Sequence, residues 1–526
     1  MHRALRILEI VEAVCAHLPP YSSPSARSTL YSIALVCRFF SGPALDVLWS
    51  TQYSLVNILP CLPVGLWEIV RFENPKPSMR AQRAMNSVDW TRFNIYARRV
   101  RTLVITDNGS EADILSAIFK MLSLSNTSQE TLFPKLRRLH WQMARRPWLS
   151  YVPLFLSSSL ESISLVTVIT SYAHLALLAV VPTLCPLLTR VEICVSGRLA
   201  HPAKSVILSK LKHVNHLSIE GISESDLAHL AHLPSLTSLS VKQPSDSIHN
   251  HSFESVARQT TPFTSLQELT LDHDSIPFVV GLLGMKHGWS LRRLSYTTRN
   301  APLAADTAKV FAVLKAKCTH SSLTHIRYSI SRTNILLYPN DGVIEQDTLR
   351  LLFVFRSLRE VVLHPGSGFD LDDSDIDALA RAWPQLYILH LHGSGFRCPA
   401  SRVTLRGLHS LAKHCHSLID LKISLDASVV FCPEDDTGID VARSKAPLQK
   451  LSVEDSIITE AAPVVAYLLR IFPSITLVTT MARQFVLPQR EFQQQCRMYD
   501  LWNQVHKMLA QIQRQSPPPT ESSIKS

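Results

Sequence analysis

The sequence predicts an α/β protein in which a short helical module precedes a long, curved solenoid of strand–turn–helix repeats. Three observations point to this fold class. Helical apolar stripes interrupted by prolines fill the first 50 residues, a six-residue apolar phrase recurs between residues 100 and 475, and a 526-residue chain is too long for one compact core. A composition of 46% hydrophobic and 18% charged residues is that of a folded chain.

Two apolar stripes at helical spacing open the chain. The first comprises Ile7, Ile10, Val11, Val14 and Leu18, and the second comprises Leu30, Ile33, Ala34, Cys37 and Phe40. Pro19-Pro20 ends the first helix, and residues 21–28 are predicted to form a polar loop. Ser41-Gly42-Pro43 predicts a break, with Pro43 in the first turn of a third helix that carries Leu45, Leu48 and Trp49. Residues 4–50 thus form about three short helices, a core small enough to need support from a partner or from the following domain.

From residue 100 a phrase repeats: apolar, two variable, apolar, one variable, apolar. Copies begin at residues 100, 136, 160, 214, 236, 266, 291, 323, 358, 386, 418 and 448, with a weaker copy at Leu188 and an ending at Ile475. The last two apolar residues of each phrase alternate, as the buried face of a short strand requires. Helix-like runs such as 225–233, 375–383 and 408–415 lie between the phrases. A mean period of about 29 residues is typical of leucine-rich repeats, so we expect an irregular leucine-rich-repeat solenoid, or horseshoe, with parallel strands on its concave side.

The amino-terminal segments ILEIVEAVCAHL (7–18), ALVCRFF (34–40) and PALDVLW (43–49) together resemble an F-box. With its repeats, the chain is similar to fungal F-box proteins that have a carboxyl-terminal leucine-rich-repeat domain. The resemblance implies docking on the Skp-type adaptor of a cullin–RING ubiquitin ligase. The adaptor-binding residues it implies are Leu8, Ile10, Val11, Val14, Leu18, Val36, Cys37, Phe40, Leu45 and Trp49. A helical apolar stripe in a partner's groove is a common recognition mode, but the same residues could instead cap the core of the neighbouring repeats.

Polar residues at the variable positions of the phrase are expected on the concave strand face, where they meet solvent or a protein target. The predicted target-binding residues are Arg138, His140, Glu161, His216, Glu268, Arg293, Arg327, Glu360, His390 and Lys422. Irregular stretches at 242–262, 297–320, 330–350 and 424–446 are expected to form loops, where binding specificity often lies.

These patterns divide the chain into five predicted parts. They are an F-box-like helical module at 1–50, a basic linker or helical cap at 51–99, the solenoid at 100–480, a capping helix at 481–514 and a disordered tail at 515–526. The capping helix is predicted from an apolar stripe of Phe492, Cys496, Tyr499, Trp502, Val505, Met508, Leu509 and Ile512. A solenoid needs closed ends, which favours capping over partner binding for this helix.

The net charge of +11 is modest for this length and favours partner steering over nucleic-acid binding. A basic cluster at 71–101 has no interleaved aromatic platform for bases. The ten cysteines form no Cys-x-x-Cys pair, which argues against a zinc ribbon and fits a reducing compartment. The most membrane-like stretch, 163–188, is broken by Pro182 and Pro186. We therefore expect no nucleic-acid or membrane partner, and a cytoplasmic or nuclear location or both.

Possible catalytic patterns have simpler interpretations. The Gly-Ser-Gly sequences within 364–369 and 392–396 directly follow predicted strands and are expected to form turns. The aspartate-rich run 370–377 lacks the glycine and glutamate of an EF-hand loop and predicts a helix start. His414 and His416 lack a third ligand at suitable spacing. We therefore predict a non-enzymatic substrate receptor without cofactor or metal; the alternative is a leucine-rich-repeat scaffold without ligase attachment.

Overall fold

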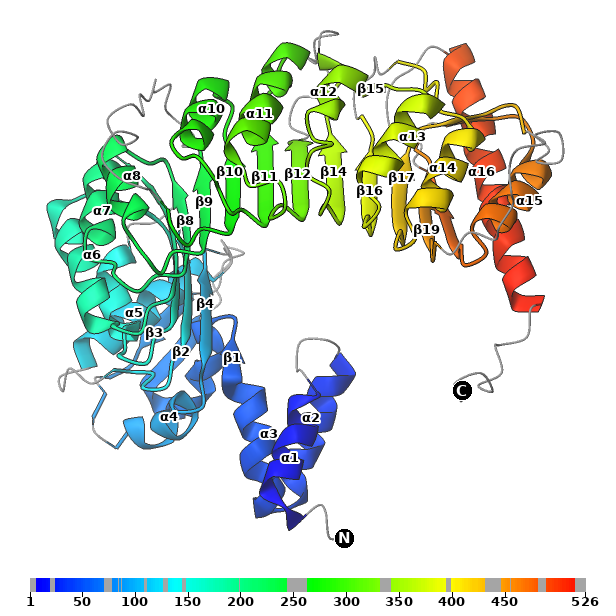
Figure 1. Ribbon diagram of the computed structural model, residues 1–526. Helices are drawn as coiled ribbons and strands as arrows, with labels where there is room; N and C mark the ends of the chain where they lie inside the picture. The colour runs from blue at the N-terminus through cyan, green and yellow to red at the C-terminus, as the bar shows by residue number, and fades with distance from the viewer. Residues whose placement is uncertain are drawn as a thin grey trace. The chain divides into compact units, whose positions relative to one another are not determined.

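The computed structural model describes residues 6–18, 24–70, 78–83, 85–86, 88–107, 111–125, 131–143, 148–197, 199–243, 263–331, 342–393, 399–430, 446–454, 456–480 and 489–515. The chain divides into two compact units, Met1–Thr237 and Ser238–Ser526. Each unit contains a parallel sheet to which every repeat contributes one strand, with helices over one face of the sheet (Figure 1). This is the leucine-rich-repeat architecture that the recurring phrase predicts.

Unit 1 begins with three helices: α1 (Leu8–Ala16), α2 (Pro24–Val36) and α3 (Arg38–Ser50). Their buried core consists of Val11, Cys15, Leu30 and Ala44, with Leu18, Ile33, Ala34, Phe40, Val47 and Leu48 packed around it. The helices therefore enclose a small apolar core of their own. The predicted stripes are only partly packed in this core: Ile7, Ile10 and Val14 of the first stripe and Cys37 of the second are exposed, whereas Cys15, outside the predicted stripe, is buried.

Two helix boundaries in this module differ from the sequence-based expectation. The helix α2 starts at Pro24, inside the stretch expected to be a polar loop, because proline suits the first helical position. The break before the third helix lies at Cys37, which is extended (φ −165°, ψ 166°), and α3 continues through Pro43. Because Pro43 and Ala44 are both buried, packing offsets the hydrogen bond that proline cannot donate.

The rest of unit 1 joins this module to the first repeats. The connecting segment contains β1 (Thr51–Gln52), η2 (Leu55–Cys61), η3 (Val64–Leu66), the antiparallel pair β2 (Trp67–Val70) and β3 (Ser78–Ala81), and α4 (Trp90–Ala97). The repeats follow as β4 (Thr102–Thr106), α5 (Ala112–Ser125), β5 (Arg138–Met143), η4 (Trp148–Phe155), β6 (Ser162–Val168), α6 (Tyr172–Leu184), β7 (Arg190–Ser196), α7 (Ala200–Leu208), β8 (His216–Glu220) and α8 (Glu224–Ala231). Strands β1 and β4 to β8 pair in parallel in this order.

Unit 2 continues the same pattern. Its elements are β9 (Ser238–Lys242), β10 (Glu268–Asp272), α10 (Ile276–Gly284), β11 (Arg293–Thr298), α11 (Ala304–Lys317), β12 (His325–Ile330), β13 (Ile344–Glu345), α12 (Gln346–Arg350), β14 (Glu360–His364), β15 (Phe369–Asp370), α13 (Asp373–Ala382), β16 (Ile388–Leu391), α14 (Leu405–His414), β17 (Asp420–Ile423), β18 (Asp426–Ala427), β19 (Lys450–Ser452), β20 (Ile457–Ile458), α15 (Ala461–Ile471), β21 (Leu477–Thr479) and α16 (Gln489–Gln515). Its main sheet pairs β9 to β12, β14, β16, β17, β19 and β21 in parallel, in that order. The pairs β13–β15 and β18–β20 form two small parallel sheets beside it.

Every copy of the repeat phrase lies on a strand, and the weaker copy at Leu188 leads into β7. The leading residue of each copy is buried, as are the alternating residues of the strand; in β5 these are Leu139 and Trp141. The same pattern of backbone hydrogen bonds recurs between strands. The carbonyl just before one strand accepts hydrogen bonds from two N–H groups of the next repeat. Arg101 O accepts from Arg137 N at 2.8 Å and from Arg138 N at 3.0 Å, and Arg359 O accepts from Tyr387 N at 2.7 Å and from Ile388 N at 3.0 Å. Register therefore depends on backbone geometry as well as on buried leucines.

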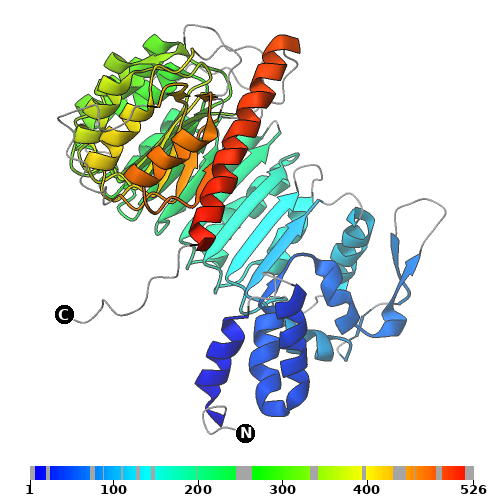
Figure 2. The same ribbon diagram turned by 90° about the vertical axis from the view of Figure 1, so that its right-hand side faces the viewer.

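The helix α16 packs along the end of unit 2 (Figure 2). Trp502, Val505 and Leu509 are buried, and the indole Nε1 of Trp502 donates to Ser456 O at 2.9 Å. Cys496, Tyr499 and Ile512 are exposed, so only part of the predicted stripe packs against the last repeat. The side chain of Phe492 lies outside the described residues, as does the tail from residue 516. Among the described segments, no helix has the length and apolar character needed to cross a bilayer.

Candidate protein-binding surfaces

The helical module exposes many large apolar side chains. On and before α1 these are Ile7, Leu8, Ile10 and Val14; on α2 and at the start of α3 they are Tyr31, Leu35, Val36 and Phe39. Val36 is 63% exposed and Leu35 is 69% exposed. Single exposed apolar residues are ordinary, but eight around one small core indicate an interaction surface. We call these eight residues the apolar module face.

The ten residues implied to bind an adaptor fall into two groups. Leu8, Ile10, Val14, Val36 and Cys37 are exposed. Val11 is buried in the module core, Leu18 and Phe40 pack against that core, and Leu45 and Trp49 are half-buried. The structure therefore brings the first group to the surface and places the second group beneath it or at its border.

Trp49 belongs to the joint between the module and the rest of unit 1. Its ring lies against Tyr96 of α4, with ring centroids 4.5 Å apart. Arg99 adds an ion pair with Asp46 and a hydrogen bond of 3.2 Å to Gly42 O. The module is therefore attached to its own chain through the end of α3, and that attachment uses none of the apolar module face.

The open face of the sheet, which the helices do not cover, is the second candidate surface. In unit 1, Arg138 lies between Thr102 and Ser162 on the neighbouring strands, and His140 lies beside Ser164. His216 pairs with Arg190 in the same manner. Glu161 lies in the turn just before β6, where its Oε1 is 3.6 Å from Nη1 of Arg137. Of the four predicted residues in unit 1, three thus lie on the strands and Glu161 lies at their edge.

In the first part of unit 2, opposite charges alternate across adjacent strands. Arg293 lies between Glu268 and His325, and Glu360 follows in the same row. The Nε of Arg293 is 3.7 Å from Oε1 of Glu268, and the Nε of Arg327 is 2.5 Å from Oε1 of Glu360. Burial lowers the pKa of His325, and Arg293 adds to this effect. Arg293 in this row and Arg327 on the next strand are therefore each paired with a carboxylate from a neighbouring strand.

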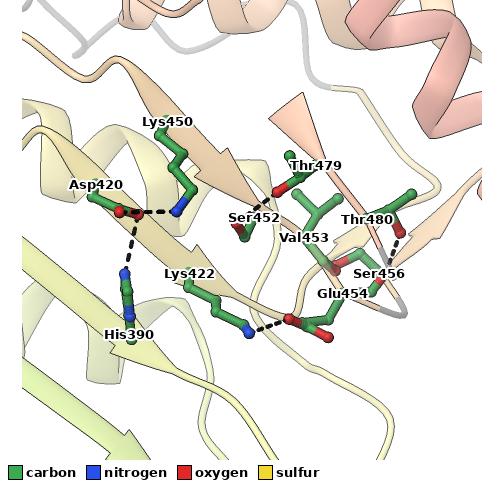
Figure 3. Close-up of polar contacts among 10 residues, drawn as sticks. All are labelled: His390, Asp420, Lys422, Lys450, Ser452, Val453, Glu454, Ser456, Thr479 and Thr480. Atoms are coloured by element: carbon green, nitrogen blue, oxygen red, sulfur yellow. Dashed lines mark hydrogen bonds and ion pairs between the residues drawn. The ribbon is translucent and has the colours of Figure 1, made fainter. Parts of the chain in front are cut away.

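The end of unit 2 carries a denser polar cluster (Figure 3). The carboxylate of Asp420 is 3.0 Å from Nε2 of His390 and 3.2 Å from Nζ of Lys450. Lys422 on the same strand forms an ion pair with Glu454. These side chains are held by one another across neighbouring strands, so a target would meet charges already fixed in position. Burial lowers the pKa of His390, whereas Asp420 acts in the opposite direction.

The sequence-based list omits Asp420, Lys450 and Glu454, which complete this cluster. Asp420 and Lys450 occupy the same variable position of their phrases as Arg138 and Arg293, so reading that position in every copy could have found them. Glu454 follows the strand in a left-handed conformation (φ 45°), and no pattern in the sequence marks it.

Three described arginines of the basic cluster at 71–101, namely Arg83, Arg99 and Arg101, contact their own chain. Arg83 forms a two-pronged contact with Asp89, at 2.6 and 2.8 Å, and this hydrogen bonding lowers the pKa of the Asp89 carboxyl to about 2. Arg101 Nη1 contacts the carbonyls of Arg98 and Lys135. Residues 71–77 lie outside the described residues.

The motifs with possible chemistry behave as structural elements. Asp372 and Asp375 form a capping box at the start of α13, which confirms the predicted helix start. Gly368, in the first Gly-Ser-Gly sequence, adopts φ 80°, as a turn requires; the second sequence lies partly outside the described residues. Within the described ranges, no group of three or more His, Cys, Asp or Glu side chains is arranged to hold a metal ion.

Comparison with known proteins gives little beyond this geometry. No protein-family model matches the chain, and no curated protein matches it. Among solved structures it is similar to an internalin (InlF) from Listeria monocytogenes, at 16% identity and a TM-score of 0.31, over 62% of this chain and 82% of that chain. It is also similar to a chain in the complex of Rad7 and Elc1 in yeast, at 14% identity and a TM-score of 0.29, over 57% of this chain and 79% of that chain. At such scores, the functional argument depends on the chain's own residues.

Proposed function

We propose that this protein is a substrate receptor of a cullin–RING ubiquitin ligase. The apolar module face docks on a Skp-type adaptor, and the open face of the sheet holds a protein target. Ubiquitin transfer is catalysed by other subunits, in the cytoplasm or the nucleus. The observation that carries the proposal is the apolar module face, in the segment whose sequence resembles an F-box.

The distribution of buried and exposed residues favours docking over capping. The module has its own core around Val11 and Leu30, and it contacts the rest of unit 1 through Trp49 and Asp46. Neither the core nor the joint uses Val14 or Val36, which are 47% and 63% exposed. An apolar stripe on short helices is the form in which helical segments enter a partner's groove.

The open face suits a polypeptide target. Its side chains stand on parallel strands, at spacings of about 4.8 Å between neighbours, and carry both signs of charge. Pairs such as Arg327–Glu360 and His390–Asp420 limit side-chain motion before a target arrives. Binding to fixed charges loses less conformational entropy than binding to free ones.

Adaptor capture tests the proposal. The full-length protein and a purified Skp-type adaptor should form a complex on size-exclusion chromatography. Changing Val14→Glu and Val36→Glu together should weaken that complex by tenfold or more, because two charges would enter an apolar interface. Val64→Glu is the matched control, since Val64 is 91% exposed and lies outside the module.

Thermal unfolding should be the same for both variants and the parent, because both changes are at exposed sites. Failure of the parent protein to bind the adaptor, or equal binding by the double variant, would remove the ligase assignment. The protein would then be a leucine-rich-repeat scaffold that uses the same open face.

A further inference from the structure

A third, basic surface lies in unit 1 at the edge of the sheet where the chain enters the strands; we call it the leading edge. Its cationic side chains come from successive turns and first strand residues: Arg101, Lys135, Arg137, Arg138, Arg190, Lys210 and Lys212. All except Arg101 are exposed. Among the described residues of these turns, one carboxylate, Glu161, lies between them, 3.6 Å from Arg137. The described side chains of the leading edge therefore carry a net positive charge.

Backbone hydrogen bonds bring these turns side by side. Arg137 N donates to Arg101 O at 2.8 Å, Glu161 N to Arg137 O at 2.8 Å, and Thr189 N to Glu161 O at 2.9 Å. Asn215 N then donates to Thr189 O at 2.8 Å. The cations in this series are Arg101 and Arg137, on neighbouring turns about 4.8 Å apart. In the next row, Arg138 and Arg190 lie on either side of Ser162.

A groove of about 420 Å³ lies at the leading edge, between the turn before β7 and the turn before β8. Its lining comes from the end of α6 and the turn after it, including Thr183 and Pro186, and from residues 209–214 before β8. Apolar atoms of Leu188, Leu211 and Val214 form part of its wall, whereas Lys212 and His213 are exposed at its rim. The groove lining contains no carboxylate. It therefore suits an apolar side chain flanked by negative charges.

The helix beside this groove supports the same conclusion. The helix α6 ends at the groove and exposes several apolar side chains: Tyr172 is 76% exposed, and Val180 and Leu184 are each 43% exposed. An outward helix face is usually polar. Leu187, in the turn that follows, is 57% exposed. An apolar helix face thus continues into a groove with a basic rim.

We propose that the leading edge of unit 1 binds an acidic polypeptide segment that inserts an apolar side chain into this groove. Negative side chains of the segment lie along Arg190, Lys212 and their neighbours, and the anchor contacts the exposed Thr183 and Pro186 in the groove. The described lining offers no aromatic platform for bases, which disfavours RNA. A concave site disfavours a flat membrane surface. This surface differs from the apolar module face and adjoins the open face at Arg138 and Arg190, so the proposal does not depend on adaptor binding.

Fluorescence polarisation with the full-length protein tests it. The probe is a labelled peptide of aspartates and glutamates with one central leucine. The peptide should bind the parent protein. Its affinity should fall steeply with added salt, because the Debye length falls from about 10 Å at 0.1 M to about 3 Å at 1 M. Arg190→Glu with Lys212→Glu should weaken binding at least tenfold. Thr183→Trp should fill the groove. It should therefore lower the affinity for the leucine peptide towards the affinity for a control peptide that has serine in place of the leucine.

The matched control is Lys315→Glu with Lys507→Glu, which reverses two exposed lysines in the other unit and should leave binding unchanged. Thermal unfolding of every variant should match the parent. Three results would overturn the proposal: no binding of the acidic peptide, equal binding by the Arg190/Lys212 variant, or tighter binding of an oligouridine RNA or of phosphatidylserine vesicles through the same two residues. Loss of adaptor capture alone would not count against the proposed site for an acidic segment.

Discussion

The carboxylate of Asp373, at the start of α13, accepts a hydrogen bond of 3.0 Å from the backbone N–H of Gly407 in the next repeat. The same carboxylate accepts from Thr404 N at 2.7 Å and from Thr404 Oγ1 at 2.6 Å. One acidic side chain therefore satisfies donors at the start of the neighbouring helix α14, where a negative charge is favourable. This contact joins two consecutive repeats on the helical side of the sheet.

Asp373→Ala should lower the free energy of unfolding by about 2 kcal/mol, because backbone donors at the start of α14 lose a charged acceptor. Urea denaturation followed by circular dichroism would measure this. Asp347→Ala is the control, since the side chain of Asp347 is 91% exposed and should change stability by less than about 0.5 kcal/mol. Equal effects of the two substitutions would show that Asp373 does not stabilise the joint.

Gly407→Ala should also destabilise unit 2, although alanine is the better helix former. An added Cβ would lie 2.8 Å from Oδ1 of Asp373 and 2.9 Å from Cγ1 of Val403, so one of them must move. We expect a loss of about 1–3 kcal/mol in the same urea experiment. Gly284→Ala in α10 is the control: a Cβ there meets nothing within 4 Å, and stability should stay the same or rise.

Because of His174, we expect the folded protein to lose stability in mild acid. Its Nδ1 accepts a hydrogen bond of 3.3 Å from Thr170 N, so the folded chain requires the neutral ring, and burial lowers the pKa of His174 below 6.5. The folded state then binds fewer protons than the unfolded state, and stability falls as the pH drops through 6.5 towards the folded value. Burial also lowers the pKa values of His325, His390, His409 and His414.

The urea midpoint should therefore be lower at about pH 5.5 than at about pH 7.5. His174→Gln should make this difference smaller, whereas His17→Gln, at an exposed site, should not. A midpoint that is the same at both pH values would contradict the prediction.

Trp502→Ala tests α16 as the cap of unit 2. Trp502 is 1% exposed and covers the last repeat, so we expect a loss of about 3–5 kcal/mol. Hydrogen exchange should become faster first in β19 and β21. Tyr499→Ala, at a side chain that is 37% exposed, should cost less than about 1 kcal/mol. If the two substitutions had equal effects, α16 would not act as a cap.

The repeats could be predicted from the sequence because their signal is local. In a phrase such as 136–141, burial alternates along the strand residues and needs no knowledge of the neighbouring strands. The path of the chain through Pro43 could not be predicted in the same way. Whether a helix tolerates that proline depends on how Pro43 and Ala44 pack against residues distant in sequence.

The candidate surfaces could also be predicted only in part, because they too depend on contacts between residues distant in sequence. The variable positions indicate which residues lie on the open face. The partner of each residue depends on strand register, as for His390 and Asp420, which are 30 positions apart. Trp49 resembles a docking residue in the sequence, whereas the structure places Tyr96 against it. The groove beside Lys212 depends on two turns from different repeats, and neither turn shows it alone.

The backbone carbonyls of Arg101 and Arg359 each accept two N–H groups from the next repeat. This has a consequence for evolution. A joint of this kind uses only main-chain atoms, so it tolerates almost any side chain at the residue that provides it. Mutations can therefore change which side chains the strands display without loosening the stack of repeats.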